Sequence, residues 1–410
     1  MNQPDYSKSS DWFARAAKVI PGGIYGHASP ALSLPGASPY YAARAEGCRY
    51  WDVDGNEFID FMCGYGPIVL GYNHPEVEEA AARQARHGNC FNHPAAVMVE
   101  LAERLVSLVD FASWAVFGKN GADMTTWCTQ VAREHTGRKK ILKITGAYHG
   151  SHAWCSPGHG GWIDEDRTHV HQFAWNDLGA FRELVTKHRS DIAGVITTAF
   201  HHPSFGDSQY PAPGFLQGIQ ETCRHEGIVF ILDDVRSGFR LHLGGSHRFF
   251  EFEPDLICFC KAIANGHPIS AALGRAELQA AAGRVFLTGS YWNSAVPMAA
   301  ALATLRVLER DNVIAGIAAR GQEYRAGIER LAAQHGLPIR YSGHPSIPFM
   351  TFADETNFMR SQFFCREAAR RGVFLHPHHN WFLCAAHQPR DIEQALAAID
   401  EAMAATKAAF

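Results

Sequence analysis

The sequence lacks any long hydrophobic run. No stretch of its 410 residues approaches the ~20 consecutive apolar residues that a membrane-spanning helix needs. Residues 1–6 also lack the basic and then apolar order of a secretory signal segment. We therefore expect a cytoplasmic protein that has no membrane among its partners.

A surplus of positive charge is lacking as well. The chain carries 37 Lys and Arg residues against 41 Asp and Glu residues, so its formal net charge at pH 7 is −4. Nucleic acids and anionic membranes attract strongly basic surfaces, and this balance gives no electrostatic basis for either partner. We therefore predict that the protein binds no nucleic acid.

Cysteines at the spacing of a disulfide framework or a zinc site are also missing. The 10 cysteines are scattered singly, and several lie inside apolar runs, which is typical of buried free thiols. Cys258 and Cys260 are only two positions apart, unlike the ligands of common zinc sites. Histidines cluster at 201–202 and 376–379, but no cysteine or carboxylate stands at matching spacing. We predict that the protein holds no metal.

Apolar material for a large core is present. Hydrophobic residues make up 47% of the chain, and its length exceeds one typical domain, so we expect two lobes. Strand-like and helix-like segments alternate through the middle, which favours a mostly parallel sheet covered by helices. Strands are expected at 115–117, 140–144, 193–197, 227–232 and 256–260, and helices at 97–109, 124–136 and 178–188.

The C-terminal part shows a different pattern. A long helix is expected over 295–320, joining the middle of the chain to the last hundred residues. Beyond it we expect short strands such as 347–352 and a final helix over 389–408. Near the other end, residues 52–56 (DVDGN) predict a tight hairpin turn, because Asp and Gly tolerate the backbone angles that such a turn needs.

A carboxylate and an amine each follow a hydrophobic strand. The apolar run 227–232 leads into Asp233, and the run 256–260 leads into Lys261, 28 positions later. A lone lysine at a strand end is usually a solvated charge, because its stem can lie along apolar neighbours while its head stays in water. The pair indicates more than that. An electron-sink cofactor needs a lysine that forms an imine and an acid that holds its pyridinium nitrogen.

Further motifs, in a fixed order, connect the chain to a known family. They are 50–56 (YWDVDGN), 118–123 (GKNGAD), 148–150 (YHG), 233–240 (DDVRSGFR) and the lysine segment 261–268 (KAIANGHP). With them, the chain resembles the class III aminotransferases that depend on pyridoxal phosphate, and within these the group around glutamate-1-semialdehyde aminomutase. The resemblance covers roughly residues 10–405.

This resemblance implies the α/β architecture called fold type I. It comprises a large domain, with a mostly parallel seven-stranded sheet flanked by helices, and a smaller α+β domain built from both termini. We expect residues 1–60 and 306–410 to form the small domain and residues 61–305 to form the large one. The resemblance also implies a homodimer whose active site is shared between the subunits.

The phosphate of pyridoxal 5′-phosphate is assigned to the turn 120–123. This turn follows a strand and precedes a helix, so the main-chain N–H groups of Gly121 and Ala122 can face an anion at the positive end of the helix dipole. Relatives commonly carry a hydroxyl residue where this chain has Ala122, which leaves only main-chain donors here. By resemblance, Ser290 reaches the phosphate from the second subunit.

The ring of the cofactor is assigned to residues from three strand ends. By resemblance, Asp233 holds the pyridinium nitrogen and Lys261 forms the imine. Tyr148, with His149 beside it, falls at the position of the aromatic residue that stacks on the ring. Val235 is expected on the opposite face, because residues i and i+2 of an extended segment share a side.

The candidate substrate pocket is aromatic and imidazole rather than ionic. His379 stands where aminomutase relatives carry a gating glutamate, and segment 21–27 lacks the arginine that many relatives use for a substrate carboxylate. Thr198 likewise replaces an acidic residue of the family. The candidate pocket residues are Tyr25, His27, Tyr65, Trp154, Trp292 and His379.

The predicted activity is therefore amino-group transfer. We expect an aminotransferase that moves an amino group between an amino acid or amine and a keto or aldehyde acceptor through a Schiff base on Lys261. An aminomutase of the glutamate-1-semialdehyde type or an amino-acid racemase would use the same apparatus, and both remain alternatives. A more distant alternative is a protein that binds pyridoxal phosphate without catalysis.

Overall fold

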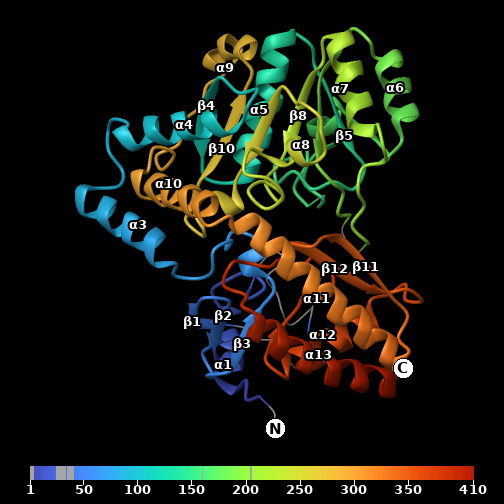
Figure 1. The fold of residues 1–410 in the computed structure, drawn as a ribbon. Coiled ribbons are helices and arrows are strands. Elements are labelled where there is room, and N and C mark those ends of the chain that lie inside the picture. The colour runs from blue at the N-terminus through green and yellow to red at the C-terminus, as the bar shows by residue number, and fades with distance from the viewer. Residues whose placement is uncertain (1–3, 25–33, 35–40, 159, 204–205) are drawn as a thin grey trace. The chain divides into compact units, whose positions relative to one another are not determined.

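The computed structural model describes residues 4–24, 34, 41–158, 160–203 and 206–410, and they divide into two compact units (Figure 1). We call residues 75–203 and 209–314 the large unit, and residues 1–74, 204–208 and 315–410 the small unit. The outer boundaries thus follow His74 and Ile314, where the sequence predicted them after residues 60 and 305. Tyr25 and His27 lie outside the described residues.

A seven-stranded sheet forms the centre of the large unit, in the order β4-β10-β9-β8-β7-β5-β6. All neighbouring strands are parallel except β10, which runs antiparallel to both β4 and β9. The mostly parallel sheet is therefore confirmed. Its strands are β4 Trp114–Gly118, β5 Lys140–Ile144, β6 Val170–Phe173, β7 Ile192–Thr198, β8 Val229–Asp233, β9 Leu256–Phe259 and β10 Ser270–Gly274.

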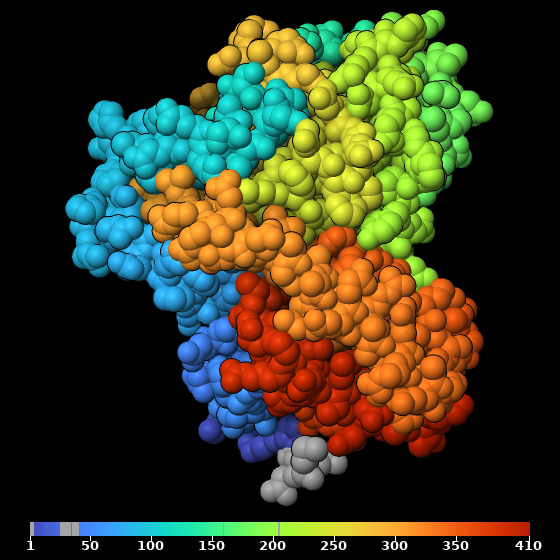
Figure 2. Space-filling model, viewed as in Figure 1, coloured from blue at the N-terminus to red at the C-terminus, as the bar shows by residue number. Residues whose placement is uncertain are grey.

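Helices cover this sheet, so its central strands read as continuous apolar runs. Figure 1 shows α5 lying along the sheet, and in Figure 2 α10 lies against α3 and α4. The helices of the large unit are α3 Pro75–His87, α4 Ala96–Leu108, α5 Gly121–Thr136, α6 Leu178–Lys187, α7 Phe215–Glu226, α8 Ser246–Phe249, α9 Gln279–Arg284 and α10 Ala295–Arg310, with short 3-10 turns at Asp164–Arg167, Lys261–Ala264 and Ala276–Leu278.

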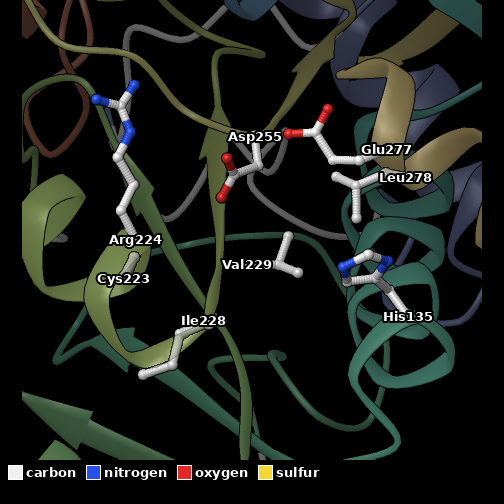
Figure 3. A pocket seen from close by; sticks show the side chains of 9 residues that line it. His135, Cys223, Arg224, Ile228, Val229, Asp255, Glu277 and Leu278 are labelled. Carbon is white, nitrogen blue, oxygen red and sulfur yellow. The ribbon is translucent and has the colours of Figure 1, made fainter.

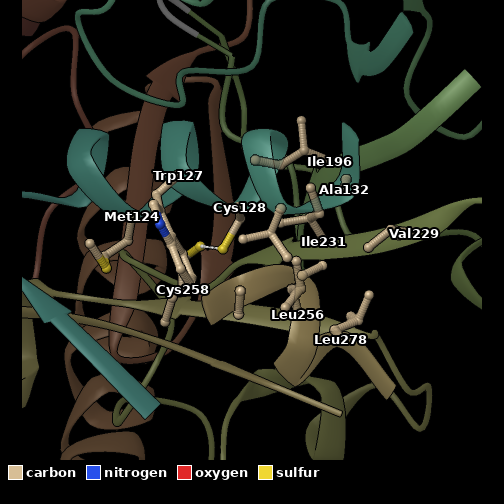
Figure 4. Close-up of a cluster of buried hydrophobic side chains, with 14 of the residues drawn as sticks. Met124, Trp127, Cys128, Ala132, Ile196, Val229, Ile231, Leu256, Cys258 and Leu278 are labelled. Carbon is tan, nitrogen blue, oxygen red and sulfur yellow. Dashed lines mark hydrogen bonds between the residues drawn. The ribbon is translucent and has the colours of Figure 1, made fainter. Parts of the chain in front are cut away.

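The core of the large unit lies between α5 and the sheet (Figure 4). Trp127 of α5 meets Trp114 edge to face, with ring centroids 6.0 Å apart. Beside them the free thiol of Cys258 donates a hydrogen bond to the sulfur of Cys128 at 3.4 Å. This packing sets the start of α5 against the ends of the central strands.

The small unit joins both ends of the chain in one sheet. In the order β1-β2-β3-β13, the C-terminal strand β13 pairs in parallel with β3. A second sheet is the hairpin of β11 and β12. The elements are α1 Ser7–Ala16, β1 Ala42–Glu46, β2 Arg49–Asp52, β3 Glu57–Asp60, a 3-10 turn Cys63–Tyr65, β11 Ile339–His344, β12 Ile347–Phe352, α12 Met359–Ala369, β13 Val373–Phe374 and α13 Pro389–Ala409.

The single helix predicted over 295–320 is wrong. The structure has two helices here, because α10 ends at Arg310 and α11 (Val313–His335) begins after a break. Asn312 between them has a φ of +47°, the left-handed conformation that ends a helix and that Asn tolerates. Apolar residues continue at helical spacing across the break, so periodicity alone did not reveal it.

In the described ranges, no helix is long and apolar enough to cross a membrane.

Candidate active site

Asp233 and Lys261 lie at the same edge of the sheet. Strands β8 and β9 are parallel neighbours, and Asp233, the last residue of β8, pairs in register with Cys258. Lys261 follows three residues later and has a φ of +37°, which is unusual for a residue with a side chain. Strained backbone of this kind clusters at functional sites. The strand order thus brings together two groups that are far apart in the sequence.

His149 holds the carboxylate of Asp233. Its Nδ1 lies 2.7 Å from Oδ2 of Asp233, and both side chains are buried. The main-chain N–H of Val235 donates to the other carboxylate oxygen at 3.2 Å. The histidine ring is stacked in turn on Trp154, with centroids 6.2 Å apart and planes at 9°. Asp233 is therefore fixed in orientation by groups from two loops.

The neighbouring Asp234 faces the other way. It is fully buried and accepts hydrogen bonds from the main-chain N–H of Ser246 at 2.8 Å and from the hydroxyl of the same serine. Burial, with a smaller contribution from the charge of Asp233, raises the pKa of Asp234 to about 7. These contacts give Asp234 a structural environment, away from Lys261.

The first turn of α5 lies close to two neighbouring loops. A Cβ on Gly121 would lie 2.9 Å from Cγ2 of Val235, and one on Gly150 would lie 2.5 Å from Cβ of Ala122. Such short distances are open only to glycine. Asp123 accepts the main-chain N–H of Asn120 at 2.8 Å and so caps the helix start.

This arrangement fits a phosphate ester. The first N–H groups of a helix have no partner within it, and they lie at the positive end of the helix dipole. Ala122 adds no hydroxyl, so only main-chain donors are available there. The same edge of the sheet carries Tyr148, which is 43% exposed, and Val235, which is half-buried. A flat ring therefore has both an exposed aromatic surface and an apolar side chain beside the capped helix start.

Sequence reasoning missed three further polar residues at this edge, namely His201, His202 and Arg236. His201 and His202 follow β7, and both are buried. Burial and the nearby charge of Arg236 lower the pKa of His201 to about 4 and hold that of His202 well below its usual value. Both imidazoles are therefore neutral at pH 7. They had been considered only as metal ligands, and the signal that could have found them is their position directly after a strand of the parallel sheet.

Lys261 has an unusually low proton affinity. Burial of its amine and, next in size, the positive charge of Arg236 lower the pKa of Lys261 to about 7. A solvated lysine has a pKa near 10.4 and is almost entirely charged at pH 7. Only a neutral amine attacks a carbonyl, and a pKa of about 7 leaves a large neutral fraction of Lys261 at neutral pH, as the predicted imine role requires.

If Lys261 forms the predicted imine, its lowered pKa determines how the rate at which the cofactor-free protein captures pyridoxal phosphate depends on pH. The cation loses its proton as the pH rises through 7, so the capture rate should rise from pH 6 and level off above about pH 8. Stopped-flow absorbance between pH 6 and 10, with Lys261→Ala as the unreactive control, measures the profile. A rate that keeps increasing to about pH 10 would show an ordinary lysine instead.

The remaining candidate residues fall in different places. Trp154 is in the large unit, where its Nε1 donates to Oγ1 of Thr126 at 2.9 Å. Tyr65 and His379 belong to the small unit and meet edge to face, with centroids 5.3 Å apart. Ser290 is exposed.

Trp292 lies along the outer strand β4 rather than beside Asp233 and Lys261. It lines a hollow of about 340 Å³ whose other walls include Met98, Val99 and residues 115–117 of β4. Because β10 and β9 separate β4 from β8, this hollow lies at the side of the sheet. In the described chain, Trp292 therefore lies on the side of β4, two positions from Ser290, and not at the ends of β8 and β9.

Another hollow opens at the opposite end of the central strands (Figure 3). Its volume is about 240 Å³, and its lining includes Val229, which begins β8, Asp255, which precedes β9, and His135 at the end of α5. Phe230 donates its main-chain N–H to Asp255 at 2.8 Å, and Arg275 pairs with it at 3.2 Å. These residues hold strand starts together, far along β8 from Asp233.

Three potential metal ligands meet in the small unit. Cys63, Cys384 and His387 are buried, with ligand atoms within 4.8 Å of one another. However, Nδ1 of His387 accepts the main-chain N–H of Cys384 at 3.0 Å and contacts its thiol at 3.3 Å. This nitrogen is already engaged by hydrogen bonding, and the absence of a metal stays a prediction.

Known proteins resemble this chain over nearly its whole length. The family described as Aminotransferase class-III matches residues 35–407. An aminopentol aminotransferase of Sphingopyxis macrogoltabida is 41% identical over 97% of this chain and 94% of its own length. A 3-aminobutyryl-CoA aminotransferase of Cloacimonas acidaminovorans is 34% identical over 98% of both chains. The solved PLP internal aldimine form of the FumI protein of Sphingopyxis sp. MTA144 has a TM-score of 0.96 at 41% identity, covering 97% of this chain and 96% of that one.

Proposed function

Because the chain belongs to the class III aminotransferases, which use pyridoxal phosphate, we propose that Lys261 is its imine-forming lysine. The enzyme then moves an amino group between an amino acid or amine and a keto or aldehyde acceptor. One observation carries this proposal. Lys261, whose pKa is about 7, and Asp233, whose carboxylate is held in orientation by His149, lie at the ends of adjacent parallel strands.

The residues of the site have separate roles in this proposal. Bound pyridoxal phosphate supplies an electron sink for negative charge on the substrate carbon. Asp233 keeps the pyridine nitrogen protonated, and His149 keeps Asp233 in position. Lys261 holds the cofactor through its amine and afterwards carries a proton at Nζ, first as base and then as acid.

The cofactor is held at its phosphate and at both ring faces. The main-chain donors of Gly121 and Ala122 bind the phosphate at the start of α5. Tyr148 would cover one face of a bound ring and Val235 the other. The close packing of Gly121 on Val235 supports this assignment, because it sets the helix start beside the residue proposed to lie under the ring.

A homodimer completes the proposed site. The hollow along β4 is largely apolar, and Val99, Phe286 and Tyr291 are 54%, 86% and 68% exposed. Exposed apolar surface of this kind marks an interface. We infer that a second copy of the chain covers it and that Ser290 then approaches the partner's phosphate. Sedimentation should give twice the chain mass of 45.2 kDa, whereas a single-chain mass would refute the dimer.

The proposed substrates have an aromatic or uncharged side chain. The predicted pocket residues Tyr65 and His379, which meet within the small unit, carry no acid or permanent cation, and His379 replaces the gating glutamate of aminomutase relatives. Apolar walls favour buried carbon area by roughly 25 cal/mol per Å² and leave a second carboxylate without a partner. We therefore expect poor conversion of glutamate semialdehyde.

A donor and acceptor screen on purified protein tests both the reaction and this preference. A transaminase releases a keto product only when an acceptor is present, whereas a racemase changes optical rotation without one. Glutamate semialdehyde converted faster than every other amino compound would favour the aminomutase alternative. A protein that binds the cofactor and converts none of the compounds would favour the non-catalytic one.

A further inference from the structure

Positive charge gathers around Lys261. Arg240 is fully buried and Arg236 is half-buried. The positive charges of both lower the pKa of Lys261, and the effect of Arg236 is the larger. Asp233 is the acid whose charge acts on both Lys261 and Arg236. Its carboxylate is already engaged by His149 and by the main-chain N–H of Val235. Asp233 is thus already bound by two other groups in addition to the cations around it.

Arg236 carries a buried donor that has no partner among the described residues. Its Nε is buried and makes no hydrogen bond within the part of the chain that the structure describes. Burial lowers the pKa of Arg236 to about 10, so the guanidinium remains charged at neutral pH. A buried charge without a partner is costly, and proteins normally pair it or use it to bind a ligand.

The neighbours of Arg236 do not neutralise it. His201 and His202, whose pKa values are lowered by burial and by Arg236 itself, are uncharged at pH 7. Tyr148 also lies close enough to interact with the charge of Arg236, but burial raises the pKa of Tyr148, so its hydroxyl keeps its proton. The planar fork of a guanidinium matches the two oxygens of a carboxylate, and it also donates to a single anionic oxygen.

We propose that Arg236 is an anion-binding residue of the active site whose ligand is an anionic oxygen. Two sources offer this chemistry: the carboxylate of a keto or amino acid and the ionised ring oxygen of the cofactor. The inference rests on the proposed function and extends it to a group that the pocket candidates do not provide. The phosphate is a separate ligand, because its donors are at the start of α5.

The experiment compares Arg236→Gln with the wild-type protein. Arg236→Lys keeps the charge but loses the fork, and Arg284→Gln removes an exposed arginine that pairs with Glu134 at 2.6 Å as the matched control. Acetate and benzoate are titrated into the cofactor-loaded proteins, and binding is followed by the visible absorption band. The dissociation constant of pyridoxal phosphate is measured on the cofactor-free proteins. Circular dichroism verifies that each variant is folded.

A loss of carboxylate binding identifies a substrate carboxylate as the ligand. In that case Arg236→Gln binds acetate and benzoate about 10- to 100-fold more weakly, as removal of a charged hydrogen bond predicts, and cofactor affinity stays within about 2-fold. If the ring oxygen is the ligand, cofactor affinity falls by about 10-fold or more and carboxylate binding is unchanged. Arg236→Lys should lie between wild type and Arg236→Gln, and Arg284→Gln should match wild type.

Unchanged affinities for both ligand types in folded Arg236→Gln would overturn the proposal. If the wild-type protein binds neither acetate nor benzoate, the dissociation constant of pyridoxal phosphate alone decides. An unchanged constant in Arg236→Gln then overturns the proposal. These binding constants do not depend on turnover. A wild-type protein that transfers no amino group would therefore refute the proposed function while the role of Arg236 could still be read.

Discussion

Lys261→Ala is expected to lower amino transfer by at least about 10³-fold, because it removes both the amine that forms the imine and the group that carries the proton. The variant should still bind pyridoxal phosphate at the start of α5 and at the ring faces. Its cofactor should dialyse away and should resist covalent fixation by borohydride. Steady-state rates with a donor and acceptor accepted by the wild type measure the loss.

Lys187→Ala is the matched control for this variant. Lys187 is exposed at the end of α6, and its removal should leave the rate unchanged. If Lys261→Ala turned over at the wild-type rate, the proposed role of Lys261 would be wrong. The unusual positive φ at position 261 makes a check of folding necessary, which circular dichroism supplies.

The second large effect is expected for Asp233→Asn. An amide can keep the hydrogen bond to His149, but it supplies no negative charge to hold the proton on the pyridine nitrogen. We expect kcat to fall by about 10²- to 10³-fold, the range found when one oriented charge or donor is lost from an active site. The cofactor should remain bound, because its phosphate and ring contacts persist.

Asp234→Asn is the comparison that tests the strand register. Asp234 is buried against Ser246, and with a pKa of about 7 it is already partly protonated at neutral pH. The amide oxygen of asparagine can accept the main-chain N–H of Ser246, and its NH2 can donate to the serine hydroxyl, so kcat should change by less than about 10-fold. The opposite order of effects would mean that Asp234, not Asp233, faces the cofactor, since adjacent strand residues point to opposite sides.

The strand ends were predictable because they depend on local pattern. Continuous apolar runs closed by Asp233 and Lys261 indicated buried strands, and Gly121 between a strand and a helix indicated an anion-binding turn. These features involve residues close together in the sequence. The break at Asn312 was also local, but the apolar period continues across it, and the interpretation as one helix was therefore wrong.

The hydrogen bond from His149 to Asp233 could not be predicted in the same way. The two residues are 84 positions apart, and nothing in the triplet 148–150 indicates which acid the imidazole contacts. The order of strands decides this contact, because β7 lies between β5 and β8 and yet the loop after β5 reaches Asp233. The effect of Arg236 on the two histidines after β7 likewise depends on neighbouring strand ends and not on local sequence.

The sequence by itself determined the family and placed Asp233 and Lys261 at the ends of two apolar strands. Only the tertiary structure decided that Asp233 is held by His149, that Asp234 faces away and that Lys261 has a pKa of about 7. The physical reason is that proton affinity and charge pairing depend on water exclusion and on distances between strands. A chain pattern specifies which groups are present, whereas packing sets how strongly each of them holds its proton.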